Sequence, residues 1–164
     1  MPFDICVKNF GRIFMIEFYE YQDDNYDKLY DMMVEFYRSD AVDHPIDTKI
    51  IRRLLDDIMS KRFSVNGYEV HYSGNLVGFG VVTTYYTSEV AGINVQLEDL
   101  YICPDYRSKG IARLYFKYIM NEFKNASRFR LEVSPRNVRA EKLYRELGFE
   151  TLEYNQMILD KPIK

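Results

Sequence analysis

A strand-like run ends in a short turn, and a helix-like run begins at the loop Arg107-Ser108-Lys109-Gly110-Ile111-Ala112. The first turn of a helix leaves backbone N–H groups unpaired and carries the positive end of the helix dipole, so it attracts anions. Gly110 would let the backbone approach a ligand closely, and the two basic residues before it add positive charge. The combination suits a pyrophosphate. The alternative is a tightly packed strand–helix junction with solvated basic side chains.

Two adjacent carboxylates, Glu98 and Asp99, lie near the end of the strand-like run that precedes this loop. Successive side chains of a strand point to opposite faces, so the two carboxylates are expected on opposite faces of a sheet. Glu98 then shares its face with Asn94 and Gln96, a polar series that suits a cleft. Asp99 shares its face with apolar neighbours and needs a partner if it is buried. The alternative for both is an ordinary strand carboxylate paired with a lysine or an arginine.

Hydrophobic periodicity and turn signals predict the elements that must position these residues. Helices are expected at residues 25–39, 48–60, 108–124 and 137–146, with Asn137 as an N-cap and Gly148 just past the last helix. Strands are expected at residues 16–21, 67–72, 76–86, 90–102, 128–133, 149–154 and 156–160, with a hairpin turn at Ser73-Gly74-Asn75. This order predicts an α/β domain with a mixed, mostly antiparallel sheet.

Length and composition limit the class of protein. The chain has 164 residues, of which 47% are apolar and 29% charged, which is typical of one globular domain. Its net charge of −3 argues against general nucleic-acid binding, and no apolar run is long enough to cross a membrane. Cys6 and Cys103 lack metal-ligand spacing and indicate free thiols in a reducing compartment, so we expect a cytoplasmic protein.

The first residues have no clear hydrophobic period and no apolar core of the kind found in a signal peptide. We therefore expect residues 1–14 to be an N-terminal extension of uncertain status and residues 15–164 to form a single domain. The extension could belong to the native protein or reflect an upstream start codon.

Two separated motifs together resemble the GNAT superfamily of acetyl-CoA-dependent N-acetyltransferases. The pattern Arg107-x-x-Gly110-x-Ala112 is similar to the family's [Q/R]xxGx[G/A] pyrophosphate loop, with alanine where many members have a second glycine. Downstream, a short strand is followed by a second similar signature: Asn137, Ala140, Tyr144 and Gly148-Phe149. The resemblance covers the chain from about residue 15 onward, and its strand motif is closest to that of small-amine and polyamine acetyltransferases.

The resemblance implies a GNAT-like fold, a twisted sheet of six to seven strands flanked by about four helices. It also implies direct transfer of an acetyl group from acetyl-CoA to an amine in a ternary complex, without a metal. The pantetheine arm would enter a splay between strands 90–102 and 128–133, along the backbone of Leu100, Tyr101 and Ile102, where an N–H would polarise the thioester carbonyl. Asn137 and Ala140 would line the other side of the arm. The pyrophosphate would lie on Arg107, Ser108, Lys109, Gly110, Ile111, Ala112 and Arg113.

The same resemblance makes Tyr144 the candidate general acid. It lies on the same helix face as Asn137 and Ala140, and a phenol can donate a proton or a hydrogen bond to the departing thiolate. The alternative is a tyrosine that only packs in the core.

The attacking amine needs a base, because a typical alkylamine is protonated at neutral pH. The resemblance favours Glu98, with Asp99 as the runner-up. The loop between the first two helices would lie over the acceptor site, where His44 is a further candidate base and Asp40 and Asp43 could hold a cationic substrate. The alternative for this loop is capping and turn chemistry.

These expectations predict an N-acetyltransferase for a primary amine of a small molecule or a peptide. The alternative is a regulatory module that binds acetyl-CoA without catalysis. Neither nucleic acid nor membrane is expected as a partner. The aromatic strand pattern at residues 149–160 offers an edge for pairing, so a homodimer is expected.

Overall fold

The computed structural model describes residues 5–9, 12–39, 42 and 45–161, with the backbone alone up to residue 14. The described residues form a six-stranded sheet in the order β1-β2-β3-β4-β5-β6, antiparallel throughout except for the parallel pair β5 and β6. The strands are β1 (Ile5–Asn9), β2 (Arg12–Glu20), β3 (Val65–Tyr72), β4 (Asn75–Thr87), β5 (Gly92–Ile102) and β6 (Arg128–Leu131). The α-helices are α1 (Tyr26–Tyr37), α2 (Thr48–Met59), α3 (Ile111–Glu122) and α4 (Val138–Glu146). The expected fold class is confirmed.

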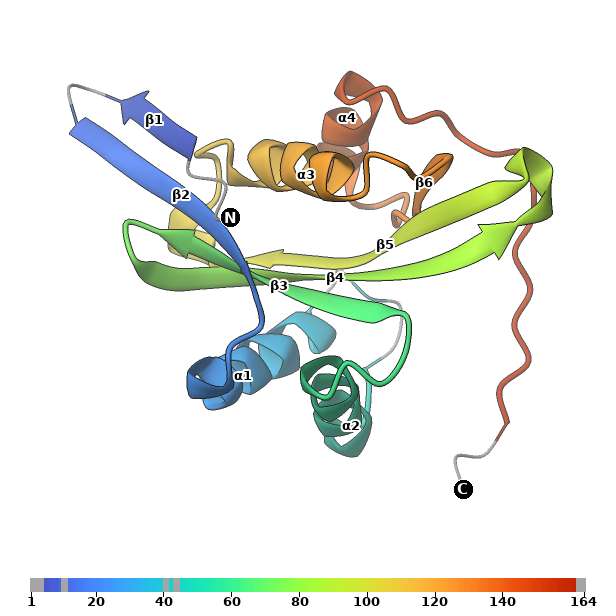
Figure 1. Ribbon diagram of the computed structural model, residues 1–164, viewed down its shortest axis with the longest axis horizontal. Helices are drawn as coiled ribbons and strands as arrows, with labels where there is room; N and C mark the ends of the chain where they lie inside the picture. Colours follow the sequence, from blue (N-terminus) through green and yellow to red (C-terminus); the bar gives the residue numbers. More distant parts are fainter. Residues whose placement is uncertain (1–4, 10–11, 40–41, 43–44, 162–164) are drawn as a thin grey trace.

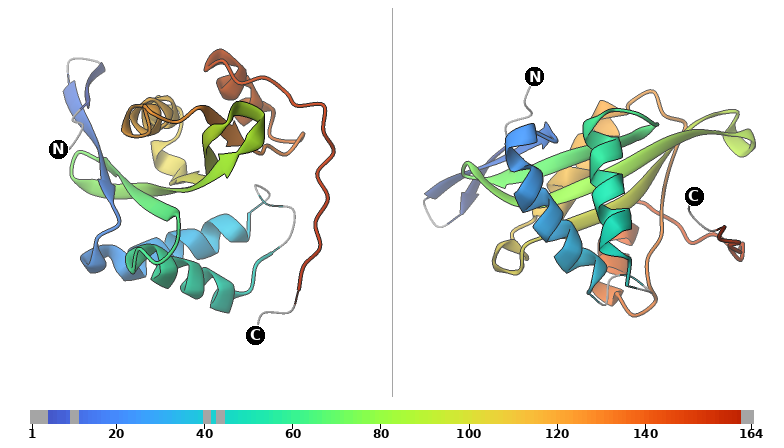
Figure 2. Two further views of the ribbon diagram at one scale, coloured as in Figure 1. Left: turned by 45° about the vertical axis from the view of Figure 1, so that its right-hand side comes forward. Right: turned by 90° about the horizontal axis from the view of Figure 1, so that it is seen from below.

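Helices cover both faces of the sheet, with α1 and α2 on one face and α3 and α4 on the other (Figures 1 and 2). The side of α1 and α2 has a core built from apolar positions of both helices and from sheet residues that include Val81 and Tyr101. The side of α3 has a second core, to which the sheet contributes Val82, Val95 and Leu97. Alternate strand residues therefore face two different cores, as the pleat of a sheet requires. None of the described helices is long and apolar enough to cross a bilayer.

The turn residues predicted two element boundaries correctly, the hairpin between β3 and β4 and the end of α4. The hairpin between β3 and β4 turns at Ser73 and Gly74, both with positive φ (+50° and +78°), which suits a two-residue turn between twisted strands. Gly148, just past α4, also has a positive φ of +93°, and a glycine tolerates this conformation at a helix end.

The N-terminal segment contributes to the sheet. β2 begins at Arg12, before the expected start at residue 16, and β1 pairs antiparallel with it from Ile5↔Ile16 to Asn9↔Arg12. The sequence pattern missed β1 because an edge strand is selected by its partner as much as by its own periodicity.

The two strands expected at residues 149–154 and 156–160 do not form. Residues 149–161 have no secondary structure and run down one side of the molecule past the sheet (Figure 1). Phe149 is still attached, with ring contacts to Phe116 and Tyr144, but the apolar residues beyond it are exposed. A strand-like pattern yields a strand only where an adjacent strand supplies hydrogen-bond partners, and none of the described segments pairs with this tail.

Candidate functional site

The loop before α3 presents open backbone groups at the helix start. Ser108 and Gly110 both adopt the left-handed conformation (φ +66° and +79°), and Gly110 is the N-cap of α3, which begins at Ile111. No side chain of the described residues caps this end, so the first N–H groups of α3 have no side-chain acceptor among them. This is the geometry that an anion such as a pyrophosphate requires.

The basic side chains of the loop bind the protein itself. Arg107 Nε donates to the carbonyl of Ile102 (2.8 Å), and Lys109 Nζ donates to the carbonyl of Asp105 (2.8 Å). The first contact ties the loop to the end of β5, and the second ties it to the short turn at Pro104–Tyr106 that follows. The side chain of Ile111 is buried in the core on the α3 side of the sheet, so at this position only the backbone faces the loop.

Arg139 joins the two signature segments. Its guanidinium donates to Ser108 Oγ (2.9 Å), which connects the first turn of α4 to the loop before α3. Arg113 in α3 pairs with Glu146 at the end of α4. The sequence analysis did not single out Arg139, because an exposed arginine one residue before Ala140 reads as a solvated helix position.

A gap opens between β5 and β6. The parallel ladder pairs Asn94 to Leu97 of β5 with Arg128 to Leu131 of β6 and stops there, although β5 continues to Ile102. Leu100, Tyr101 and Ile102 therefore have no strand partner on this edge among the described residues. Those of their backbone groups that face the gap can pair with a ligand amide, as the expected splay requires, although the carbonyl of Ile102 already accepts from Arg107.

The second signature lies in and just before α4, which follows β6 on the α3 side of the sheet (Figure 1). Asn137 caps α4, accepting a hydrogen bond from the backbone N–H of Ala140 (3.2 Å), which confirms the predicted N-cap. Tyr144 is half-buried, with its ring at 5.3 Å from Phe116 and 6.1 Å from Phe149 between centroids. Burial raises the pKa of Tyr144, so its hydroxyl is protonated at neutral pH and can donate.

Glu98 is an extra residue in β5. The β4–β5 ladder pairs Val81 with Asp99 and Val82 with Leu97, which leaves Glu98 without a partner on β4. Such a β-bulge interrupts the alternation of side chains along the strand. Its effect on the two carboxylates follows from their contacts with β4.

Both carboxylates face the side of α1 and α2. Val81 packs in the core of that side, and cross-strand partners share a face, so Asp99 points there too. Thr83 lies two residues beyond Val81, on the same face, and donates from its hydroxyl to Glu98 (2.6 Å). The expectation that Glu98 and Asp99 occupy opposite faces is therefore wrong, because the bulge turns Glu98 to the side of Asp99.

Asp99 lies in a buried environment beside α1. Tyr37, at the end of α1, donates a hydrogen bond to Asp99 Oδ2 (2.5 Å). Burial raises the pKa of Asp99 to about 6; the Tyr37 hydrogen bond lowers it, and the Glu98 carboxylate raises it. The pKa of Tyr37 is raised by burial first and then by Asp99, so this hydroxyl remains a donor. The sequence analysis treated Tyr37 only as part of the apolar stripe of its helix.

Three predicted substrate residues, Asp40, Asp43 and His44, lie outside the described residues. Cys103 follows β5, and burial raises the pKa of its thiol, which opposes a role as a thiolate nucleophile. The described part of the chain holds no group of three or more metal-ligating side chains.

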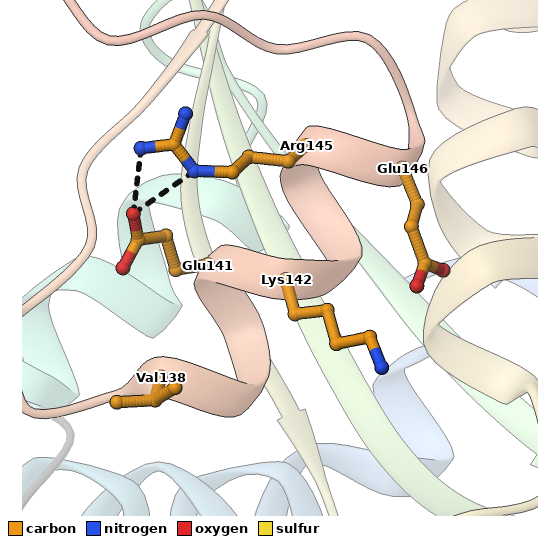
Figure 3. Close-up of a pocket in the computed structure, with 5 residues that line it drawn as sticks. All are labelled: Val138, Glu141, Lys142, Arg145 and Glu146. Carbon is orange, nitrogen blue, oxygen red and sulfur yellow. Dashed lines mark hydrogen bonds and ion pairs between the residues drawn. The ribbon is translucent and has the colours of Figure 1, made fainter.

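A shallow pocket of about 530 Å³ lies on the outer face of α4 (Figure 3). It is lined by Val138, Glu141, Lys142, Arg145 and Glu146, and Arg145 pairs with Glu141 in it (2.7 Å). None of the predicted site residues lines this pocket, so it is separate from the gap between β5 and β6.

The model of the Acetyltransferase (GNAT) family matches residues 16–149. The chain belongs to this family. Its match begins at Ile16, so β1 and the first residues of β2 lie outside the family model.

Similar proteins fall within the same enzyme class. The chain is 39% identical over 79 residues to the mouse (Mus musculus) thialysine N-epsilon-acetyltransferase, covering 47% of this chain and 46% of that protein. It thus spans about half the length of the curated relatives that it matches.

Solved structures share the fold. A possible acetyltransferase from Clostridium difficile has a TM-score of 0.77 at 19% identity, covering 90% of this chain and 99% of that one. An aminoglycoside N-acetyltransferase in complex with CoA has a TM-score of 0.73 at 14% identity, covering 92% and 98%. At these identities the likeness concerns the fold.

Proposed function

We propose that this protein transfers an acetyl group from acetyl-CoA directly to a primary amine of a small molecule or a peptide. The carrying observation is the gap between β5 and β6, with an open helix N-terminus at one end and a pair of carboxylates, Glu98 and Asp99, on the side of α1 and α2. We infer that anion-binding and proton-accepting groups act together at this opening. The names of the similar proteins support an amine acceptor, since one acts on the epsilon amine of thialysine and another on aminoglycosides.

The residues at the gap fit acetyl-CoA, which would supply the reactive thioester. The backbone of Ser108 to Arg113 would hold the pyrophosphate, supported by the left-handed Gly110 and the uncapped start of α3. The free edge of Leu100 to Ile102 would pair with the pantetheine amides, and a backbone N–H there would stabilise negative charge on the carbonyl oxygen. Arg139, which already contacts Ser108, adds positive charge beside this loop.

Two carboxylates of different environment can divide the work on the amine. Asp99 has a pKa of about 6, so it is ionised at neutral pH. This pKa lies near the working pH, which suits a group that accepts a proton from the ammonium form of the amine. Glu98 is exposed and attracts the cation to the opening. The structure supports Asp99 more strongly as the base, and Glu98 is the alternative.

Tyr144 completes the proposal on the other wall of the gap. Its hydroxyl has no hydrogen-bond partner among the described residues and is protonated at neutral pH. It can therefore donate to the thiolate as the carbon–sulfur bond breaks.

Thiol release from acetyl-CoA, measured against a panel of primary amines, tests the proposed activity. Calorimetry with acetyl-CoA on the same preparation separates catalysis from binding. Release with at least one amine is expected. Tight binding of acetyl-CoA with no release on any amine would instead favour a non-catalytic module.

The exposed tail supports a further part of the proposal, a homodimer. Met157, Ile158 and Leu159 are 84–95% exposed, which is costly for apolar side chains in water. A strand-patterned tail without a partner in its own chain can pair with a second copy. Sedimentation at micromolar concentration should give a dimer, and Ile158→Ser should weaken it. A monomer of the wild-type chain would contradict this assembly.

A further inference from the structure

The sheet face that holds Glu98 and Asp99 continues into β6. In the β5–β6 ladder, Val95 pairs with Phe129, and both pack in the core of the α3 side. Their sequence neighbours therefore point to the other face, where α1 and α2 lie. These neighbours form two cross-strand pairs, Asn94 with Arg128 and Gln96 with Arg130.

This face has opposite charge at its two ends. The carboxylates mark the end nearest the gap, and two arginines mark the other. Arg128 is neutralised by an ion pair with Glu89. Arg130 is half-buried, and its guanidinium has no ion-pair or hydrogen-bond partner among the described residues. A partly desolvated, unpaired guanidinium is a site for a planar anion such as a carboxylate.

Asn94 provides a second, independent observation. Its side chain is fully buried, yet neither the amide nitrogen nor the amide oxygen has a hydrogen-bond partner in the described part of the chain. An unsatisfied buried amide costs stability, so its presence in a native protein needs an explanation, and a bound polar ligand is one. Asn94 lies beside Arg128 and two residues from Gln96, so this orphan group belongs to the basic end of the face.

The spacing between the two ends defines the ligand. Gln96, the partner of Arg130, lies two and three residues before Glu98 and Asp99, which corresponds to roughly 7–10 Å along an extended strand. A molecule that places an amine at the carboxylates and an anion at Arg130 must therefore be bifunctional, with a short flexible chain between the two groups.

We propose that Arg130 binds a carboxylate of the acceptor, so that the preferred substrate is a zwitterionic, amino-acid-like amine whose reacting amino group sits at the far end of an aliphatic chain. This inference rests on the proposed acetyltransferase function and names the substrate class of the same site. Arg130 is a specificity-determining residue, with Gln96 and the buried amide of Asn94 as polar neighbours.

Lysine and its decarboxylated counterpart cadaverine form the test pair, because they differ only by the carboxylate. Their kcat/KM values are measured by thiol release with wild type, Arg130→Gln and the control Arg53→Gln, which removes an exposed arginine of α2 paired with Asp57. Arg130→Gln should lower kcat/KM for lysine about 10- to 100-fold, the range of one hydrogen bond to a charged group, and leave cadaverine within a few-fold. The control should change neither.

The outcomes separate this inference from the proposed function. Equal changes for lysine and cadaverine in Arg130→Gln, or a wild type that acetylates cadaverine and not lysine, would overturn the role of Arg130 while leaving the acetyltransferase intact. If no amine gives thiol release from acetyl-CoA, the proposed function itself is contradicted. Asn94→Leu gives a second readout: we expect an unchanged or higher melting temperature together with weaker discrimination between the two amines. Wild-type discrimination in this variant would remove Asn94 from the site.

Discussion

The loop before α3 and the carboxylate-bearing face of β5 differ in how the sequence encodes them. The loop is contiguous: Arg107 to Arg113 follow one another, and a glycine with positive φ and an uncapped helix start are local properties. The face is assembled from distant residues, since Tyr37 and Asp99 lie 62 positions apart and meet only through packing of α1 on the sheet. A linear pattern can therefore reveal the first region and only part of the second.

Function is divided in the same way under our proposal. The loop and α4 would bind acetyl-CoA and assist the leaving group, whereas the face of β5 would select the amine and take its proton. Variants of the loop should change the affinity for acetyl-CoA, whereas variants of the face should change the pH–rate profile or the KM for the amine.

Tyr144→Phe carries the largest expected effect. Turnover should fall by about 10²–10⁴, the usual contribution of a general acid, because the variant cannot donate to the thiolate. The free energy of unfolding should change by no more than about 1–2 kcal/mol, since only one hydroxyl is lost. Initial rates and thermal melts on one preparation measure both, and Tyr154→Phe, in the exposed tail, is the matched control. A lower melting temperature with intact turnover would show that Tyr144 only packs.

Asp99→Asn should lower turnover by about 10²–10³ and remove the acidic limb of the pH–rate profile. The wild-type rate should fall as the pH drops through about 6, because protonation of Asp99 removes the base. Glu98→Gln is the comparison variant and should retain this limb while raising KM for the amine. If Glu98→Gln loses the limb and Asp99→Asn keeps it, the two roles are reversed.

Gly110→Asp should weaken acetyl-CoA binding about 100-fold, because it adds negative charge at the proposed pyrophosphate site. Gly74→Asp is a close control: both glycines have nearly the same positive φ (+79° and +78°), and a Cβ at either would meet no atom within 4 Å. Both variants should therefore show similar strain, while calorimetry detects lost affinity in only one. Equal affinity in the two variants would exclude the loop as the anion site.

Tyr37→Phe is expected to have the smallest effect and the most specific one. Its hydrogen bond stabilises the Asp99 carboxylate, so its loss should raise the pKa of Asp99 further. The acidic limb of the pH–rate profile should move to higher pH, and the rate on the plateau above it should change little. Tyr26→Phe removes a comparable hydroxyl-to-carboxylate bond on the same helix, to Asp56 (2.6 Å), and should leave the profile in place. An unmoved limb in Tyr37→Phe would separate α1 from the proton transfer.

Local signals in the sequence determined the positions of several helices and turns and the family of this protein. Amphipathic stripes located the four helices, Ser73-Gly74 located a hairpin, and Asn137 and Gly148 marked the ends of α4, because each of these depends on neighbours within a few residues. The spacing of the loop motif and of the second signature was enough to identify the family, which the family model confirms.

Tertiary structure alone decided the rest. The bulge at Glu98 arises from the register between β4 and β5, and that register brings both carboxylates to one face where simple alternation separates them. The pairing of β1 and the absence of strands at residues 149–161 depend on which edges find a partner. The raised pKa of Asp99 depends on burial by a distant helix. Each is a non-local property, since backbone pairing and desolvation are set by segments far apart in the chain, and no window of sequence contains both partners.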